Sequence, residues 1–189
     1  MPILIKKLND LDENKWENLL LTSNFSSFYQ TKFWAEVWEK SFPFCQGIFF
    51  VLEDDKGNYQ AGLPLIQFKK KGFFSYYSMP YGTYGGLIGE VPVDEKRKLI
   101  QEIIRFCGGK RWLRLQIVDF FDQHKELEKL DFKKIQTFTH SINLENPGSE
   151  IGFQKRGFEQ SLKKELTIRA IGTMDEVKIC YQLYLTTAQ

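Results

Sequence analysis

The sequence has 189 residues, of which 42% are hydrophobic and 15% aromatic, enough for one substantial core and one domain. Its 26 basic and 24 acidic residues leave a formal net charge of +2, so the overall charge predicts neither a nucleic-acid nor a membrane partner. The first twenty residues lack a basic region followed by an apolar run, and no apolar segment approaches the roughly 20 residues of a membrane span. Cys45, Cys107 and Cys180 are too scattered for a disulfide or zinc set, so we expect a cytoplasmic protein with no membrane span.

Two amphipathic helices are predicted in the N-terminal part of the chain. Asp10 followed by Glu13 resembles a capping box that opens the first helix. The segment FYQTKFWAEVW predicts the second, because Thr31 can cap its first turn and apolar residues then recur on one face. We expect Phe33 and Val37 of that face to pack in the core.

Apolar and aromatic runs predict several strands around these helices. Residues 54–58 contain the Asp, Gly and Asn that a tight turn needs, so the strands on either side should form a hairpin. The last strand of this group leads into YYSMPYGTYGGLIG, residues 76–89, whose glycines and tyrosines suit a backbone that turns sharply or lies against a ligand. The predicted strands span residues 3–7, 48–52, 59–68 and 73–78.

The next predicted helix is capped by Asp94 and buries the apolar face of residues 99–107 before it ends at Gly108 and Gly109. A half-buried strand follows at 113–117. The remaining predicted segments are a polar helical or turn segment at 122–134, strands at 134–144 and 166–171, a basic helix from Ser149, and a last helix at 174–185, which should bury Val177, Cys180 and Tyr184. About six strands and five helices in irregular alternation indicate a mixed sheet covered by helices.

No motif of a metal or nucleotide site is present. The two histidines, His124 and His140, lie in unrelated contexts, and HExxH, CxxC, P-loop, Rossmann and nucleophile-elbow patterns are absent, so we predict no metal site. An acyl-coenzyme A site would need a glycine-rich loop at a strand-to-helix junction to receive the pyrophosphate. The three near matches, at 105–110, 154–159 and 169–174, each end on the wrong residue, so we predict no cofactor.

Four segments in order resemble one known family. FYQTKFWAEVW, SYYSMPYGTYGGLIG, FQKRGFEQSLKKELTIRA and the helix ending in YLTT are similar to the N-terminal half of the FemAB-like transferases. That resemblance implies a GNAT-like fold: a mixed, mostly antiparallel twisted sheet with helices on both faces. It also implies an aminoacyl or acyl transferase whose acceptor is a cell-wall peptide or polysaccharide precursor and whose donor is aminoacyl-tRNA or another acyl donor.

The resemblance places a substrate-binding groove on six residues. Gln30 and Trp34 correspond to the Gln and Trp of the family's first motif, and the loop from Tyr81 through Gly82 and Tyr84 to Gly86 corresponds to its glycine-rich loop, which we expect at a surface cleft. Lys155 and Arg156 correspond to the basic pair that the family carries ahead of a helix, and Arg156 would offer a planar fork to a carboxylate or phosphate at the rim of the groove. The other interpretation, that Trp34 is a core residue and Arg156 a solvated one, stays open, and no catalytic residue is assigned.

The sequence departs from the family at several points. Glu36 and Trp38 stand where related transferases tend to carry lysines for the phosphates of a precursor, and Thr83 stands where a proline is common. The family also continues into a second GNAT-like domain. The resemblance therefore implies an N-terminal domain at 1–172 and, at 173–189, a helix like the first helix of a missing second domain. The chain would then be a fragment, one half of a split enzyme or a degenerate stand-alone half, and we expect it to be inactive alone. If a second domain is missing, the helix should leave an apolar face that a second chain or dimer mate covers.

Two other functions remain open at this stage. A non-catalytic ligand-binding or interaction domain could retain the fold and the loop without an acyl-donor site. RNA binding is the other, through basic residues interleaved with aromatic ones, although the balanced charge and the absence of an RNA-module signature count against it. The basic residues of that interpretation are Lys69, Lys70, Lys71, Lys110, Arg111, Arg114, Lys155 and Arg156.

Overall fold

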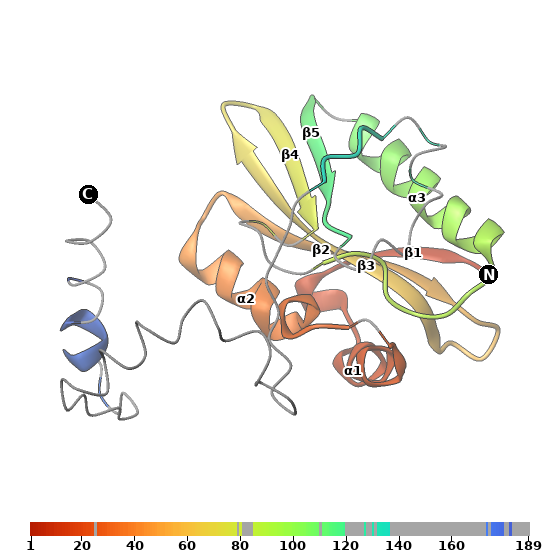
Figure 1. Ribbon diagram of the computed structural model, residues 1–189, viewed down its shortest axis with the longest axis horizontal. Helices are drawn as coiled ribbons and strands as arrows, with labels where there is room; N and C mark the ends of the chain where they lie inside the picture. The colour runs from red at the N-terminus through yellow and green to blue at the C-terminus, as the bar shows by residue number, and fades with distance from the viewer. Residues whose placement is uncertain are drawn as a thin grey trace, which may run out of the picture. The chain divides into compact units, whose positions relative to one another are not determined.

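The computed structural model describes residues 1–24, 26–78, 80, 85–109, 111–119, 127, 130, 132–136, 173, 175–179 and 182. The chain divides into two units, Met1–Ile135 and Gln136–Gln189. The named elements all belong to the first unit (Figure 1). In chain order they are β1 (Ile3–Lys7), η1 (Leu8–Asp10), α1 (Glu13–Thr22), η2 (Phe28–Gln30), α2 (Lys32–Ser41), β2 (Cys45–Glu53), β3 (Tyr59–Lys70), β4 (Phe73–Ser78), α3 (Val93–Gly108) and β5 (Trp112–Ile117).

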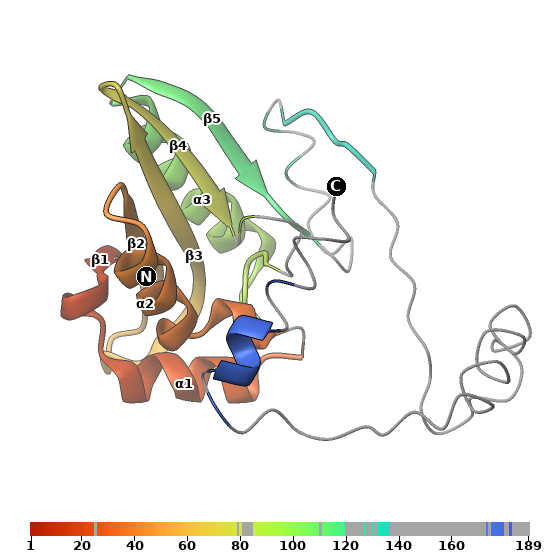
Figure 2. The same cartoon turned by 90° about the vertical axis from the view of Figure 1, so that its left-hand side faces the viewer.

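The strands form one sheet in the order β1-β2-β3-β4-β5. The first three pairs are antiparallel, whereas β4 and β5 are parallel and are connected through α3, as parallel neighbours require a crossover. Figures 1 and 2 show α1 and α2 on one face of this sheet and α3 on the other. The predicted mixed, mostly antiparallel sheet with helices on both faces is confirmed. No helix in the described residues is long and apolar enough to cross a membrane.

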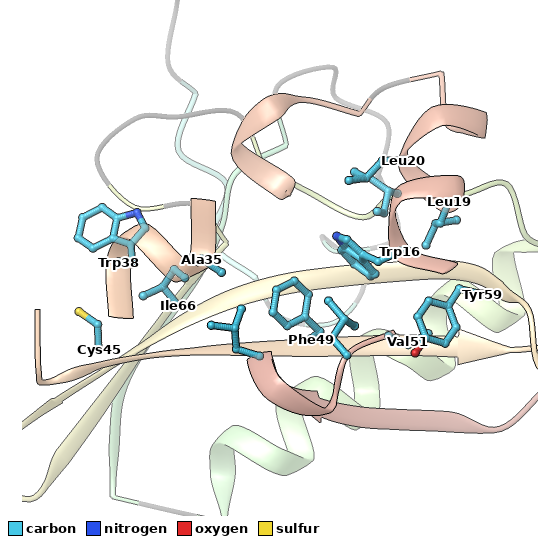
Figure 3. Packing of buried hydrophobic residues seen from close by; sticks show 13 residues of the cluster. Trp16, Leu19, Leu20, Ala35, Trp38, Cys45, Phe49, Val51, Tyr59 and Ile66 are labelled. Carbon is cyan, nitrogen blue, oxygen red and sulfur yellow. The ribbon is translucent and has the colours of Figure 1, made fainter. Parts of the chain in front are cut away.

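The two central strands are buried on both faces because their side chains alternate between two hydrophobic clusters. Phe49 and Val51 of β2 pack under α1 and α2, while Phe50 and Leu52 of the same strand pack under α3. Figure 3 shows the first cluster, in which the Trp16 ring meets Phe49 edge to face with centroids 5.1 Å apart. The apolar face predicted for residues 99–107 is buried in the second cluster, as expected.

Two of the three predicted helix caps are displaced by two residues. Asp10 belongs to the short η1 turn, and the N-cap of α1 is Asp12, whose Oδ1 accepts a hydrogen bond of 3.2 Å from the Lys15 N–H. Asp94 lies inside the first turn of α3, which begins after Pro92. Proline has a fixed φ and no N–H, and both properties suit the start of a helix. The boundary of α3 therefore lies at Pro92 and not at Asp94. Thr31 caps α2 as predicted.

The burial expected for Phe33 is wrong. This side chain is 60% exposed, Val37 is half-buried, and the buried residues of α2 are Ala35 and Trp38. The cause is the close approach of α2 to β2, since a Cβ added at Gly47 would lie only 3.2 Å from the Ala35 Cβ. A small residue has to face the strand there, and the helix turns Phe33 outward.

The second unit is described at few positions. Residues 175–179 are helical, and the Thr173 Oγ1 accepts from the Glu176 N–H at 3.3 Å, a cap at the start of this helix. Val177 is 43% exposed, so its predicted burial is wrong, while Cys180 and Tyr184 lie outside the described residues. So do most of the predicted elements between residues 122 and 172, and the boundary at 172 stays a prediction.

Tyr76 generates a stability prediction because its phenol is fully buried and, among the described residues, its hydroxyl has no hydrogen-bond partner. Burial raises the pKa of Tyr76 to about 12, with a smaller contribution from Cys107. Removing an unpaired buried hydroxyl while keeping the ring should raise the free energy of unfolding of Tyr76→Phe by roughly 1 kcal/mol.

Tyr59→Phe is the matched control, because the Tyr59 hydroxyl is buried but hydrogen-bonded by the Asp12 backbone. Its loss should lower the free energy of unfolding by about the same amount. Urea denaturation of the two variants gives the sign of each change, and a destabilised Tyr76→Phe would show that the hydroxyl is satisfied in solution.

Candidate functional site

Gln30 joins three segments that are distant in the sequence. Its side-chain Nε2 donates to the Gly86 carbonyl at 2.9 Å, and its Oε1 accepts from the Ser27 N–H at 2.8 Å. Its backbone carbonyl accepts from the Trp16 indole N–H at 2.9 Å. With only 1% of its surface exposed, Gln30 holds the end of the tyrosine-glycine loop against η2 and α1.

The described end of that loop completes the sheet where β4 stops. Gly62 of β3 exchanges two backbone hydrogen bonds of 2.9 and 3.0 Å with Ile88, and Gly85 forms a parallel bridge with Asp119, just after β5. Residues 85–88 therefore continue the line of β4 between β3 and the chain that follows β5. At the junction, the Ser78 Oγ accepts from the Val118 N–H at 2.8 Å, which keeps the ends of β4 and β5 together.

An aromatic cluster lies beside Gln30 at the start of α2. The Trp34 ring contacts Phe28 and Tyr29 with centroid distances of 5.7 and 5.4 Å, and Phe28 also contacts Phe33 at 6.1 Å. Phe28 and Phe33 are 56% and 60% exposed, whereas Trp34 is half-buried. The Trp34 indole Nε1 is buried and, among the described residues, has no hydrogen-bond partner. This cluster of Phe28, Tyr29, Phe33 and Trp34 is called the aromatic site below.

The structure brings together two of the six predicted site residues. Gln30 and Trp34 flank the Thr31 cap of α2, and Gln30 reaches the loop through Gly86. Tyr81, Gly82, Tyr84 and Arg156 lie outside the described residues, so their place in the groove stays a prediction. Gly86, predicted at a surface cleft, is buried at the end of the loop.

Sequence reasoning misses the exposed rings of the aromatic site. Helical spacing alone assigns Phe33 to the core, and it gives Phe28 no role. The available signal is the concentration of aromatic residues on both sides of a cap, FYQTKFW, since residues that precede a cap cannot continue the buried stripe of the helix.

The N-terminus of α3, which follows the loop, is not suited to a phosphate. Asp94 and Glu95 occupy its first turn, and the favourable N-terminal dipole is thus used by the chain's own carboxylates. A hydrogen bond from Lys98 lowers the pKa of Glu95 and keeps this carboxylate charged. Among the described residues, no group of His, Cys, Asp and Glu could hold a metal ion.

Comparison with known proteins identifies the fold. A scan against protein-family models and a search of curated proteins found no match. The chain is similar to a crystal structure of FemX, with 10% identity and a TM-score of 0.50 over 68% of this chain and 30% of that chain. It is also similar to a ribosomal-protein-alanine N-acetyltransferase from Brucella melitensis biovar Abortus 2308, with 14% identity and a TM-score of 0.45 over 76% of this chain and 100% of that chain. The similarity to FemX concerns the fold alone, and with it the predicted fold class is confirmed. The chain spans 30% of the length of the FemX structure.

The contact between Gly62 and Trp16 generates a prediction for the support of this site. A Cβ at Gly62 would lie 2.5 Å from the Trp16 ring and 2.9 Å from the backbone carbonyl oxygen of Phe50. The ring cannot move without losing its bond to the Gln30 carbonyl. Gly62→Ala should therefore lower the free energy of unfolding by roughly 1–3 kcal/mol, the usual range for overpacking a core.

Gly108→Ala is the control, because a Cβ there meets nothing within 4 Å. At the end of α3 this substitution should leave stability unchanged or raise it by up to about 1 kcal/mol. Guanidinium denaturation of both variants tests the contrast, and equal effects at the two glycines would refute the role of the Trp16 contact.

Proposed function

We propose that this chain is the acceptor-binding, N-terminal half of a FemAB-like transferase. The complete enzyme would move an aminoacyl or acyl group onto a cell-wall peptide or polysaccharide precursor, with aminoacyl-tRNA or another acyl donor as the source. The motif resemblance over the length of the sequence supports the family, and the fold shared with FemX is consistent with it. The donor would be handled by a second domain or chain, so this chain alone is expected to bind and not to catalyse.

The observation that carries the proposal is the unpartnered indole N–H of Trp34 beside two exposed rings. A buried donor left unpaired is destabilising by about 1–3 kcal/mol, and such groups are rare in native structures unless they serve a purpose. A carbonyl or hydroxyl oxygen of a bound sugar or peptide would satisfy this N–H. The faces of Phe28 and Phe33 would cover the apolar parts of the same ligand.

Gln30 has a positioning role in this proposal. Its bond to the Gly86 carbonyl fixes the point at which the tyrosine-glycine loop rejoins the sheet. The loop residues Tyr81, Gly82 and Tyr84 would supply further contacts to the acceptor. Arg156 would bind an anionic group of the acceptor at the rim of the groove.

A non-catalytic binding domain is the second candidate, and one observation favours it. The described side chains of the site are three hydrocarbon or indole rings, one phenol and one amide, at Phe28, Phe33, Trp34, Tyr29 and Gln30. None of these five is a carboxylate, imidazole, thiol or amine, the groups that most often transfer protons or attack carbonyl groups in enzymes. Both candidates share the ligand site and differ in whether transfer follows.

Trp34→Phe tests the ligand site, since it removes the N–H and keeps a ring. With a soluble nucleotide-linked cell-wall precursor as the probe in isothermal titration calorimetry, affinity should fall by roughly three- to tenfold, the effect of one hydrogen bond. Thermal stability should not fall, because the indole N–H makes no bond in the free protein. Trp38→Phe, one helical turn on in the core, is the matched control and should leave affinity unchanged.

Transfer is tested separately, by expressing the chain together with the coding sequence that follows codon 189. Labelled aminoacyl-tRNA and the precursor are then supplied to the purified product. Formation of labelled precursor that depends on Trp34 would support the transferase, whereas binding without transfer would support the binding domain. If neither Trp34→Phe nor Phe33→Ala changes precursor affinity, the aromatic site is not the acceptor site.

A further inference from the structure

One end of the sheet combines exposed basic side chains with exposed apolar ones. The tip of the β3–β4 hairpin lies there, and Figures 1 and 2 both show the start of β5 beside it, at the end of the sheet away from α1. The chain between α2 and β2 also lies there, because the Lys69 N–H donates to the Phe44 carbonyl at 2.9 Å. The start of β5 is held to the hairpin by the Phe74 N–H, which donates to the Arg111 carbonyl at 2.8 Å. This basic end consists of Phe42, Phe44, Lys69, Lys70, Lys71, Phe73, Arg111, Trp112, Leu113 and Arg114.

The charge at this end has one sign. The five basic side chains, Lys69, Lys70, Lys71, Arg111 and Arg114, are all exposed, and none of residues 41–46, 67–78 and 106–118 is acidic. On the neighbouring helices, Glu39 accepts a hydrogen bond from the Gly47 N–H and Glu102 pairs with Arg105. The apex of the hairpin, Lys71 with φ 50° and Gly72 with φ 80°, is a tight turn that presents the lysines outward.

Apolar side chains are exposed among these charges. Leu113 is 68% exposed, Phe44 49%, Trp112 44% and Phe73 43%. Single exposed apolar residues are ordinary, but here several lie on three adjoining segments among lysines and arginines, a combination that favours an interaction surface. Lysine stems can lie along apolar side chains while their ammonium groups reach outward.

We propose that the basic end binds the surface of an anionic lipid bilayer. Lys69, Lys70 and Lys71, with Arg111, would contact lipid phosphates and other anionic headgroups, and Leu113, Phe73 and Trp112 would enter the boundary between headgroups and acyl chains. Tryptophan favours this boundary, and basic clusters gain affinity from the negative potential of anionic lipids. The inference is independent of the proposed transferase function, because no residue of the aromatic site takes part.

The side chains favour a bilayer over a nucleic acid. The most exposed apolar side chain of the basic end, Leu113, has no ring to stack on a base, and the Tyr77 ring is covered by the Arg114 guanidinium, whose Cζ lies 5.8 Å from the ring centroid. Aliphatic and phenylalanine side chains gain mainly by leaving water for an apolar medium. Three of the five charges are also lysines, compact point charges that suit the diffuse negative potential of an anionic lipid surface.

The charge contribution is tested by sedimentation of the full chain with vesicles. We expect binding to vesicles of equal parts phosphatidylcholine and phosphatidylglycerol, no binding to phosphatidylcholine alone, and release at high salt. The triple variant Lys69→Ala, Lys70→Ala, Lys71→Ala should lower the partition coefficient about a hundredfold, from roughly fivefold per lysine. The control with the same change of charge, Lys15→Ala, Lys56→Ala, Lys96→Ala, should bind as the parent does. An equal loss in both triple variants would refute a localised surface.

The apolar contribution is tested by fluorescence quenching with brominated phospholipids in the same anionic vesicles. Trp112 should be quenched, and Trp112→Phe should remove most of the quenching, because Trp16 and Trp34 lie away from the basic end and Trp38, which contacts Phe42 there, is buried. Phe73→Ser with Leu113→Ser should weaken binding while far-ultraviolet circular dichroism stays unchanged. Absence of vesicle binding, or binding without quenching, would overturn the proposal. So would a single-stranded RNA oligonucleotide that binds the chain more tightly than the vesicles and displaces them, an outcome that would assign the surface to nucleic acid.

Discussion

The site depends on a closed series of contacts, here called the circuit, that runs from Gly62 of β3 through Trp16, Gln30 and Gly86 and returns to Gly62. Because Gly62 has no Cβ, the Trp16 ring can lie directly against β3, and there its N–H reaches the Gln30 carbonyl. The Gln30 amide then binds the Gly86 carbonyl, and two residues later Ile88 returns to the backbone of Gly62. These mutually dependent contacts hold α1, η2, the loop and β3 together. We therefore expect a substitution that breaks one of them to displace the aromatic site.

This circuit also determines what kind of recognition the sheet permits. Beyond Ser78 the position next to β3 is filled by residues 85–88, so the backbone there is already paired. Pro64 lies two residues beyond Gly62 and would direct its N–H to the same side, but proline has none to offer. Among the described residues, β3 therefore offers a ligand at this end of β4 little unpaired backbone, and side chains such as those of the proposed aromatic site would have to hold it.

The architecture of the described part could be predicted from the sequence because local rules decide it. The apolar runs of β2 and β3, the turn residues at 54–58 and the apolar face of α3 each predict their element without knowledge of the others. The site could be predicted only in part. Phe33 is exposed because of how closely α2 approaches Gly47, and Gln30 is buried because of a carbonyl 56 residues away. Such facts depend on tertiary contacts, which periodicity does not contain.

The overall charge, like periodicity, does not show which side chains the fold brings together. Their placement bears on how the two proposed surfaces would work together. A net charge of +2 predicts no polyanionic partner, yet the fold gathers basic residues from β3 and β5 at one end of the sheet.

Parallel strands begin at a common end and finish at a common end. The basic end is where β4 and β5 begin, and the loop beside the aromatic site rejoins the sheet where they finish. β4 has six residues, so at about 3.3 Å per residue the two ends are separated by roughly 20 Å. α2 covers the same interval, beginning at the aromatic site and ending at Phe42. A chain resting on lipid through its basic end would thus hold the aromatic site on the aqueous side, about a strand length from the headgroups. That position suits an acceptor whose reactive group projects from the membrane or is free in solution, and not one buried at the lipid surface.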